Sequence, residues 1–251
     1  MELGLTDQVA LVVGASRGIG AAIATTLAAE GCNLYLTHLG DGRNARDVAA
    51  RVEALGREVE VEDVDASDFG GAPEVLDAVL ERFGRFDILV YNAGITADAV
   101  IWNLAEEAWD VVLDVNLKGC FSYARAAAIH FRTKQRGKIV TVASINGLRG
   151  KFGQTNYAAS KGGMIAFTAA LARELGRFDV NVNAVAPGMV DTELTREIPQ
   201  EYVTAAREET VLGRIATVDD VANVVAFLCS DRARHITGEC VRIDGGQAIG
   251  C

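Results

Sequence analysis

A short apolar run that leads straight into a glycine-rich turn stands at residues 9–20, which read VALVVGASRGIG. The glycines Gly14, Gly18 and Gly20 follow the spacing G-x-x-x-G-x-G, which differs from the G-x-G-x-x-G dinucleotide fingerprint. Glycine lets the backbone turn sharply and approach a ligand closely, and the helix that follows offers free N–H groups to a pyrophosphate. The stretch therefore predicts a strand, a phosphate-binding turn and a helix, although a tight turn without a ligand fits the same residues.

The same alternation of strand and helix extends along the chain. Apolar runs without polar alternation are typical of parallel strands buried on both faces. The expected strands are residues 9–13, 33–37, 59–63, 88–91, 138–143, 180–186 and 240–244, and the expected helices are residues 19–30, 44–55, 74–83, 106–132, 157–175 and 218–229. This pattern predicts an α/β fold with one domain over residues 1–251, a doubly wound, seven-stranded parallel sheet and helices on both faces. The least regular segment, residues 189–213, is expected to pass over the ligand site as a lid; an ordinary surface insertion is the alternative.

The composition narrows the class of protein. Of the 251 residues, 50% are hydrophobic, which excludes a disordered chain. The 24 basic and 34 acidic side chains give a net charge of −10, which argues against a nucleic-acid partner. No apolar run reaches the roughly 18 residues of a membrane helix, and no signal peptide is visible. The five cysteines are scattered without a C-x-x-C pair, so we expect reduced thiols in a cytoplasmic protein and no metal site.

The end of the second expected strand bears on which dinucleotide would bind. An acidic residue is expected there for NAD, because a carboxylate holds the ribose 2′-hydroxyl. This chain has Thr37 and His38 instead, with Arg17 in the glycine turn. A guanidinium can hold a 2′-phosphate. Two further arginines follow shortly, Arg43 and Arg46. The residues favour NADP(H) over NAD(H), although Asp41 would reverse the preference if it turned inward.

A tyrosine and a lysine share one face near the start of an expected helix, at Tyr157 and Lys161. A phenol with a pKa near 10 is a poor acid–base group at pH 7, and a nearby ammonium lowers that pKa. Such a pair also arises by chance on solvated helices. Two candidate partners are Ser144, at the end of the fifth expected strand, and Asn116, a polar residue in an apolar helical segment. The same sheet edge is expected to carry Asn92-Ala93-Gly94 and Pro187-Gly188.

Together and in this order, the motifs resemble the short-chain dehydrogenase/reductase family over essentially the whole chain. They are residues 14–20, Asp65, Asn92-Ala93-Gly94, Asn116, Ser144, Tyr157-x-x-x-Lys161, Pro187-Gly188 and Asp244-Gly245-Gly246. Two positions depart from the family pattern. Val13 replaces the usual threonine, which removes a hydroxyl that helps to pin the loop around Asn92, and Tyr91 replaces the asparagine of many members. The resemblance implies a Rossmann fold and an NAD(P)-dependent oxidoreductase.

The resemblance also implies a role for each matching residue. Tyr157 would donate a proton to a substrate carbonyl oxygen, and Ser144 would hydrogen-bond that oxygen. Lys161 would hold the nicotinamide ribose and lower the Tyr157 pKa, while Asn116 would organise a water chain that resupplies the proton. The implied cofactor-binding residues are Gly14, Ser16, Arg17, Gly18, Ile19, Gly20, Thr37, His38, Asp65, Ala66, Asn92, Ala93, Gly94, Tyr157, Lys161, Pro187, Gly188, Val190 and Thr192. The pattern implies no metal ion.

Residues 144–157, which read SINGLRGKFGQTNY, resemble the reductases of 3-oxoacyl thioesters carried by acyl carrier protein or CoA. The resemblance thus implies an NADPH-dependent reductase that forms a 3-hydroxyacyl product. A dehydrogenase or carbonyl reductase of a small secondary or cyclic alcohol is the alternative within the family. A non-catalytic NADP-binding regulator is a further alternative, which the complete set of Asn116, Ser144, Tyr157 and Lys161 disfavours.

The expected partners follow from charge and from the resemblance. Six basic side chains are candidates for docking an anionic carrier: Arg132, Lys134, Arg136, Lys138, Arg173 and Arg177. A solvated helix end is an equal alternative for the first four. The resemblance implies a homotetramer built by helix pairing and by the strand region at residues 240–246. We expect a small-molecule or carrier-bound acyl substrate, no nucleic acid and no membrane.

Overall fold

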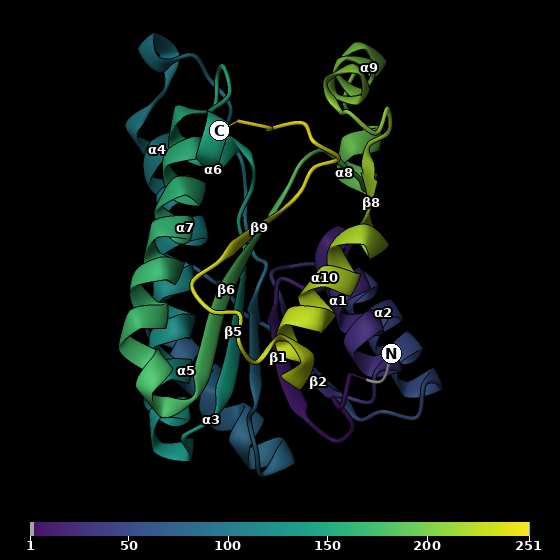
Figure 1. Ribbon diagram of the computed structural model, residues 1–251, viewed down its shortest axis with the longest axis vertical. Helices are drawn as coiled ribbons and strands as arrows, with labels where there is room; N and C mark the ends of the chain where they lie inside the picture. The colour runs from purple at the N-terminus through teal and green to yellow at the C-terminus, as the bar shows by residue number, and fades with distance from the viewer. Residues whose placement is uncertain (1–2, 251) are drawn as a thin grey trace.

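The central element is a seven-stranded sheet in which every strand runs parallel to its neighbours (Figure 1). The structure is a computed structural model that describes residues 3–250. The strands of this sheet are β1 (Val9–Val13), β2 (Asn33–His38), β3 (Val59–Asp63), β4 (Ile88–Tyr91), β5 (Gly137–Val142), β6 (Val180–Pro187) and β9 (Cys240–Ile243). The doubly wound parallel sheet predicted from the sequence is confirmed.

The strand order is β3-β2-β1-β4-β5-β6-β9, so the direction of winding reverses between β1 and β4. Val13 at the end of β1 lies opposite Thr37 of β2 on one side and Tyr91 of β4 on the other. The chain therefore leaves these three strands at one edge of the sheet. In open parallel sheets, ligands bind outside the carboxyl ends of the strands at this reversal.

Helices cover both faces of the sheet, and Figure 1 shows the two groups on opposite sides. One face carries α1 (Gly18–Ala29), α2 (Gly42–Ala54) and α10 (Val218–Cys229). The other face carries α3 (Gly71–Phe83), α5 (Gly119–Lys134) and α7 (Thr155–Leu175). Strand β1 explains the division, because its side chains alternate between the faces. Ala10 and Val12 pack beneath α1 and α10, whereas Leu11 and Val13 pack beneath α5 and α7.

Strand β3 differs from the expectation of strands buried on both faces. Its five residues are partly or fully exposed because it forms one edge of the sheet. Charged residues at such an edge, here Glu60 and Glu62, discourage pairing with another chain. A purely apolar pattern therefore described the central strands better than this outer one.

The prediction of a single helix over residues 106–132 is wrong in one respect. This segment is divided into α4 (Glu106–Leu113), a π-turn (Asp114–Lys118) and α5. In the π-turn, the Gly119 amide donates to the carbonyl of Asp114, five residues earlier. An extra residue is thus inserted into the helix, and Asn116 lies in this turn, fully buried. Other element boundaries differ from the expectation by three residues or fewer.

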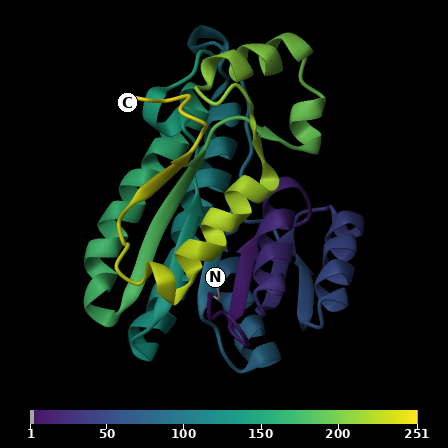
Figure 2. The same ribbon diagram turned by 45° about the vertical axis from the view of Figure 1, so that its right-hand side comes forward.

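The segment at residues 189–213 contains a short strand and two helices. They are β7 (Val190–Asp191), α8 (Glu193–Arg196) and α9 (Gln200–Glu209), and β7 pairs with β8 (Ala216–Thr217). Figure 2 shows this green segment beyond the end of the sheet. The remaining short elements are α6 (Asn146–Arg149) and the 3₁₀ turns Ile101–Asn103, Gly176–Phe178 and Asp231–Ala233. Within residues 3–250, no helix has the length and apolar character needed to span a membrane.

Candidate active site

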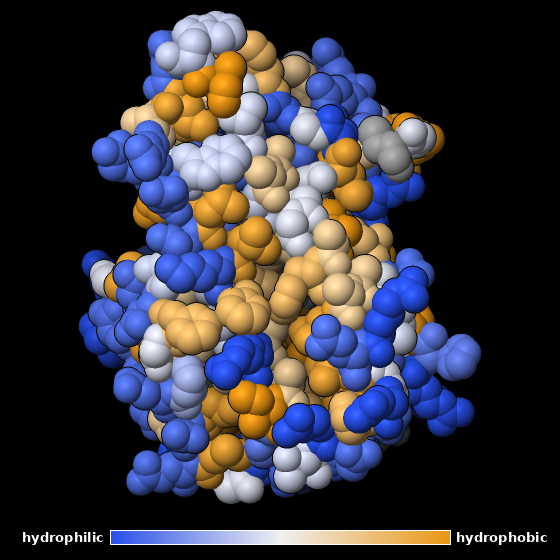
Figure 3. All heavy atoms as spheres, turned by 90° about the vertical axis from the view of Figure 1, so that its left-hand side faces the viewer, coloured by the Kyte–Doolittle hydropathy of each residue, from blue (hydrophilic) through white to orange (hydrophobic). Residues whose placement is uncertain are grey.

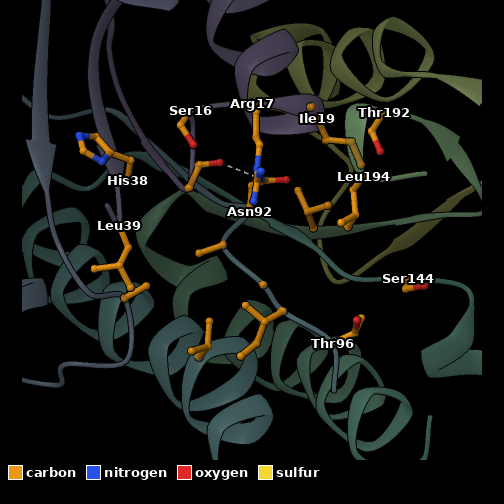
Figure 4. A pocket seen from close by; sticks show the side chains of 18 of the residues that line it. Ser16, Arg17, Ile19, His38, Leu39, Asn92, Thr96, Ser144, Thr192 and Leu194 are labelled. Carbon is orange, nitrogen blue, oxygen red and sulfur yellow. Dashed lines mark hydrogen bonds between the residues drawn. The ribbon is translucent and has the colours of Figure 1, made fainter. Parts of the chain in front are cut away.

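A cavity of about 420 Å³ opens at the carboxyl ends of the strands where the winding reverses. Figure 4 looks into it: Ser16, Arg17 and Ile19 come from the glycine turn and α1, His38 from the end of β2, and Ser144 from beyond β5. The cavity is therefore built from loops that are far apart in sequence. Its position is the one that the topology predicts for a ligand.

Two glycines of the turn are required by close approach of backbone. A Cβ on Gly14 would lie 2.8 Å from the Ala93 backbone, and Gly14 has a φ of +80°. A Cβ on Gly20 would collide with the carbonyl oxygen of Gly14. Helix α1 begins within the turn, at Gly18, with no side-chain cap and no acidic residue in its first turn. Its first amide groups are thus available for a phosphate, and the turn fits a dinucleotide pyrophosphate.

The loop after β4 is pinned by the backbone of the glycine turn. The amides of Asn92 and Ala93 donate to the Val13 carbonyl at 3.0 and 2.8 Å. The Asn92 side-chain amide donates to the Gly14 carbonyl at 2.6 Å. None of these three hydrogen bonds uses the side chain of residue 13, so the loop stays joined to the turn although Val13 has no hydroxyl.

The end of β2 forms the part of the cavity that would face the ribose 2′-position. Thr37, His38 and the exposed Leu39 line it, together with Arg17. The buried His38 ring accepts a hydrogen bond at Nδ1 from the Asp41 amide at 3.3 Å. The Asp41 carboxylate itself accepts from the Asn44 side chain and does not line the cavity. Of the three arginines considered from the sequence, only Arg17 lines the cavity, because Arg43 and Arg46 lie on the exposed side of α2.

Ser144, Tyr157 and Lys161 meet at the inner end of the same cavity. Ser144 lies just beyond β5, and the other two lie one turn apart near the start of α7. The Lys161 ammonium donates to the Val142 carbonyl at 2.8 Å and lies 5.8 Å from the centre of the Tyr157 ring. The i, i+4 spacing therefore puts a phenol and an amine beside a hydroxyl, as the sequence predicted.

The protonation of this group differs from the sequence-based prediction. Burial raises the pKa of Tyr157, and interaction with the Ser144 hydroxyl lowers it only in part. Burial also lowers the pKa of Lys161 from 10.5 to about 8. The ammonium is directed at the Val142 carbonyl, and the pKa of Tyr157 is raised, whereas the sequence predicted that it is lowered. The protein alone therefore keeps Tyr157 protonated, as a proton donor requires.

Asn116 lies behind these residues and is fully buried. Its Oδ1 accepts from the Ile95 amide at 2.8 Å, and its Nδ2 donates to the Ile95 carbonyl and the Ser160 hydroxyl, each at 3.0 Å. The Ser160 hydroxyl in turn donates to the Tyr157 carbonyl at 2.8 Å. Asn116 thus joins the loop after β4 to the turn of α7 that carries Tyr157.

The cavity brings together nearly all of the residues predicted to bind a cofactor. Gly20 lies behind the turn, and Val190 lines a neighbouring cavity. Sequence reasoning missed nine lining residues: Leu39, Val64, Ile95, Thr96, Val115, Val142, Ala143, Glu193 and Leu194. They adjoin predicted positions, and this adjacency was the one signal available, because none belongs to a recognisable chemical motif. Within residues 3–250, no three His, Cys, Asp or Glu side chains are grouped to hold a metal ion.

A second cavity of about 330 Å³ adjoins Ser144 and Tyr157. Apolar residues of the 189–213 segment line one side of it, among them Met189 and Ala206. Three hydrogen-bonded polar side chains, Asn146, Arg149 and Gln154, also line this cavity, and Gln154 connects them to Asp98 outside it. Asp98 accepts from Gln154, Gln154 accepts from Asn146, and Asn146 accepts from Arg149. This cavity is open to the reactive groups and is suited to a substrate with both polar and apolar parts.

The basic cluster considered for docking a carrier lies at the other end of β5 from Ser144. Lys138 is buried and donates to Asn181 at 2.7 Å, so it is not part of a docking surface. Arg136 is paired with Asp231 at 3.2 Å. Arg132 is exposed beside a groove between α5 and α7. Of the six predicted basic residues, Arg132 and Arg177 line this groove together, whereas Arg136 and Lys138 do not line it, because strand β5 begins within the cluster.

Comparisons with known proteins agree with this geometry. A family model described as enoyl-(acyl carrier protein) reductase matches residues 14–248. The chain is 38% identical over 245 residues to the 3-oxoacyl-[acyl-carrier-protein] reductase FabG of Thermotoga maritima, which covers 98% of this chain and 99% of that protein. The FabG of Escherichia coli K12 is 38% identical over 240 residues, or 96% and 97% of the two chains.

Among solved structures, one from Sinorhizobium meliloti 1021 assigned to the short-chain alcohol dehydrogenases superimposes with a TM-score of 0.94. It is 34% identical, and the match covers 98% of each chain. Full-length similarity in sequence and in structure accompanies the site described above. The chain therefore belongs to the short-chain dehydrogenase/reductase family and is an oxidoreductase acting on CH–OH and keto groups.

Proposed function

We propose that this chain is an NADPH-dependent reductase of the 3-keto group of 3-oxoacyl thioesters. The observation that carries the proposal is that Ser144 and Tyr157 line both cavities, with Lys161 beside them in the first. The first cavity fits a dinucleotide through its glycine turn, and the second offers room for an acyl group beside the same hydroxyl and phenol. A carbonyl placed between them would face both a proton donor and a hydride source.

The residues of the chain would act on the substrate carbonyl oxygen. When bound, the nicotinamide supplies the hydride. Ser144 donates a hydrogen bond to the carbonyl oxygen and fixes its position, and Tyr157 transfers its proton to that oxygen as negative charge develops. Lys161 is buried behind Tyr157 and carries positive charge below about pH 8. Asn116 holds the Tyr157 turn of α7 through Ser160. The family resemblance gives Asn116 the further role of organising a water chain that resupplies the proton.

Arg17 supports the preference for NADPH. It lines the same cavity as Thr37 and His38, which stand where a carboxylate would repel a 2′-phosphate. We expect faster initial rates with NADPH than with NADH. Arg17→Gln should raise the KM for NADPH about 10- to 100-fold, since one charge-assisted contact is lost, and change the KM for NADH little. Better turnover with NADH in the unaltered protein would overturn the assignment.

The thioester substrate is supported by residues 144–157 and by the activity for which the FabG relatives are named. The test is a profile of NADPH oxidation over acetoacetyl-CoA, longer 3-oxoacyl thioesters and simple ketones. We expect the largest kcat/KM for a 3-oxoacyl thioester. A larger kcat/KM for a free ketone or cyclic alcohol would favour the alternative of a small-alcohol dehydrogenase, which the resemblance to the Sinorhizobium structure keeps open.

A further inference from the structure

Tyr91, the last residue of β4, makes a contact that the roles described above do not use. Its side chain is fully buried, and its ring packs against that of Tyr123 with centroids 5.8 Å apart. The hydroxyl donates a hydrogen bond to the backbone carbonyl of Val115 at 2.5 Å. Burial raises the pKa of Tyr91 well above its ordinary value, so the hydroxyl keeps its proton and remains a donor.

The acceptor of this hydrogen bond lies in the π-turn. Val115 is the second residue of Asp114–Lys118, where the regular i to i+4 pattern of the helix is interrupted. A side chain that reaches into the backbone hydrogen bonds of a helix is a recognised cause of such an interruption. The hydroxyl therefore contacts the helix at the place where its geometry changes.

Gly119, the first residue of α5, is matched to this contact. A Cβ at this position would collide with the Tyr91 hydroxyl and with the Ala66 carbonyl. Its backbone is ordinary right-handed helix, so glycine is needed here for space and not for conformation. The tyrosine and the glycine thus form a complementary pair across β4 and the helix.

Asn116 follows Val115 directly, and its amide reaches Ile95 on one side and Ser160 on the other. A one-residue change in the turn would rotate this side chain away from both, because successive helical residues point about 100° apart. We propose that Tyr91 is a positioning residue whose hydroxyl holds the π-turn in the register that lets Asn116 reach Ile95 and Ser160. The link to turnover rests on the proposed function, in which Asn116 supports Tyr157.

The test compares Tyr91→Phe with the matched control Tyr123→Phe. Tyr123 is also buried and touches the same ring, but its hydroxyl has no hydrogen-bond partner among the described residues. In Tyr91→Phe we expect amide hydrogen exchange at residues 114–120 to be about fivefold to tenfold faster, without any substrate present. We also expect kcat for acetoacetyl-CoA to fall about fivefold to tenfold, with KM and the Kd for NADPH unchanged. Tyr123→Phe should change none of these quantities.

A double variant tests whether Tyr91 acts through Asn116. In an Asn116→Ala background, Tyr91→Phe should cost no further turnover, because the side chain that it positions is gone. A further loss in that background, equal changes in the Tyr91 and Tyr123 variants, or an unchanged kcat in Tyr91→Phe would each overturn the proposal. If the unaltered protein reduces no 3-oxoacyl thioester, the proposed function fails, and the exchange measurement alone still decides whether Tyr91 holds the π-turn.

Discussion

Lys161 illustrates, at the scale of one residue, how burial changes the chemistry of a side chain. Only 3% of it is exposed, and its ammonium has one carbonyl, that of Val142, to replace the water it has lost. Burial lowers its pKa from 10.5 to about 8. The positive charge that would hold a ribose hydroxyl is therefore present at pH 7, but it is lost when the pH rises past about 8.

This pKa change predicts a pH dependence of stability. An unfolded chain keeps the lysine proton up to about pH 10.5, whereas the folded protein releases it near pH 8. Between these values the unfolded state binds more protons, so the free energy of unfolding should rise with pH. Relative to Lys161→Met, the wild type should gain about 2 kcal/mol between pH 7 and pH 10. Urea unfolding of both cofactor-free proteins across this range measures it; a constant difference would refute the burial argument.

The sequence predicted the residues of the site better than their electrostatics. The spacing of Tyr157 and Lys161 was enough to place both on one helix face. Whether the amine or burial governs the Tyr157 pKa depends on the Val142 carbonyl and on the depth of the site, which only the folded chain defines. Arg43 and Arg46 show the same limit, because both are near a predicted phosphate site in sequence, yet neither lines the cavity.

At the scale of elements, the end of α9 is hydrogen-bonded to two other parts of the chain. The Glu209 carboxylate accepts hydrogen bonds from Arg149 of α6 at 2.9 Å and from Gln247 beyond β9 at 2.8 Å. These contacts lower the pKa of Glu209, that with Gln247 most strongly. All three residues line the second cavity, so these hydrogen bonds close one side of the proposed acyl site.

Removing the hydrogen bonds of Glu209 should weaken substrate binding more than it slows the chemical step. Glu209→Ala should raise the KM for acetoacetyl-CoA about twofold to fivefold with kcat nearly unchanged, a modest effect because the carboxylate is half exposed. The exposed neighbour Glu208 provides the control variant, Glu208→Ala, which should leave KM unchanged. Steady-state kinetics measure KM and kcat for both variants. Equal changes in KM would show that the charge of α9, and not the hydrogen bonds of Glu209, is responsible.

The elements themselves were largely predictable, since buried strands and amphipathic helices leave a periodic pattern in the sequence. The π-turn was not, because its cause is a contact between Tyr91 and Val115 across 24 positions of the chain. The helices α8 and α9 were expected only as an irregular segment. Their short lengths and polar residues give little periodicity, and their packing comes from β7, α6 and the C-terminal region.

At the scale of the whole molecule, one face stands out as apolar. A groove of about 640 Å³ runs between α5 and α7, lined by Phe121, Ile129 and Phe167. Figure 3 looks onto this side, where apolar side chains gather in the middle of the surface between hydrophilic margins. Phe121 and Ile129 are 41% and 51% exposed. Apolar side chains gathered in this way are typical of an interface between subunits.

The family resemblance implies a homotetramer formed in part by helix pairing, and this face is where such pairing would occur. Ile129→Glu should therefore reduce the sedimenting species from tetramer to dimer or monomer, because a charge would be buried in the contact. Leu55→Glu, at the exposed end of α2 on the other face of the sheet, should leave the assembly intact. Sedimentation velocity of the two variants and of the wild type measures the size of each assembly. A monomeric wild-type protein would contradict the expectation.

The most direct test of the proposed chemistry is reduction of acetoacetyl-CoA by the wild type and by Tyr157→Phe, with NADPH affinity measured in parallel. If Tyr157 supplies the proton, the variant should lose turnover by about 10³-fold, within the range for a general acid, and keep its Kd for NADPH within about twofold. Turnover by Tyr157→Phe at the wild-type rate would contradict the account.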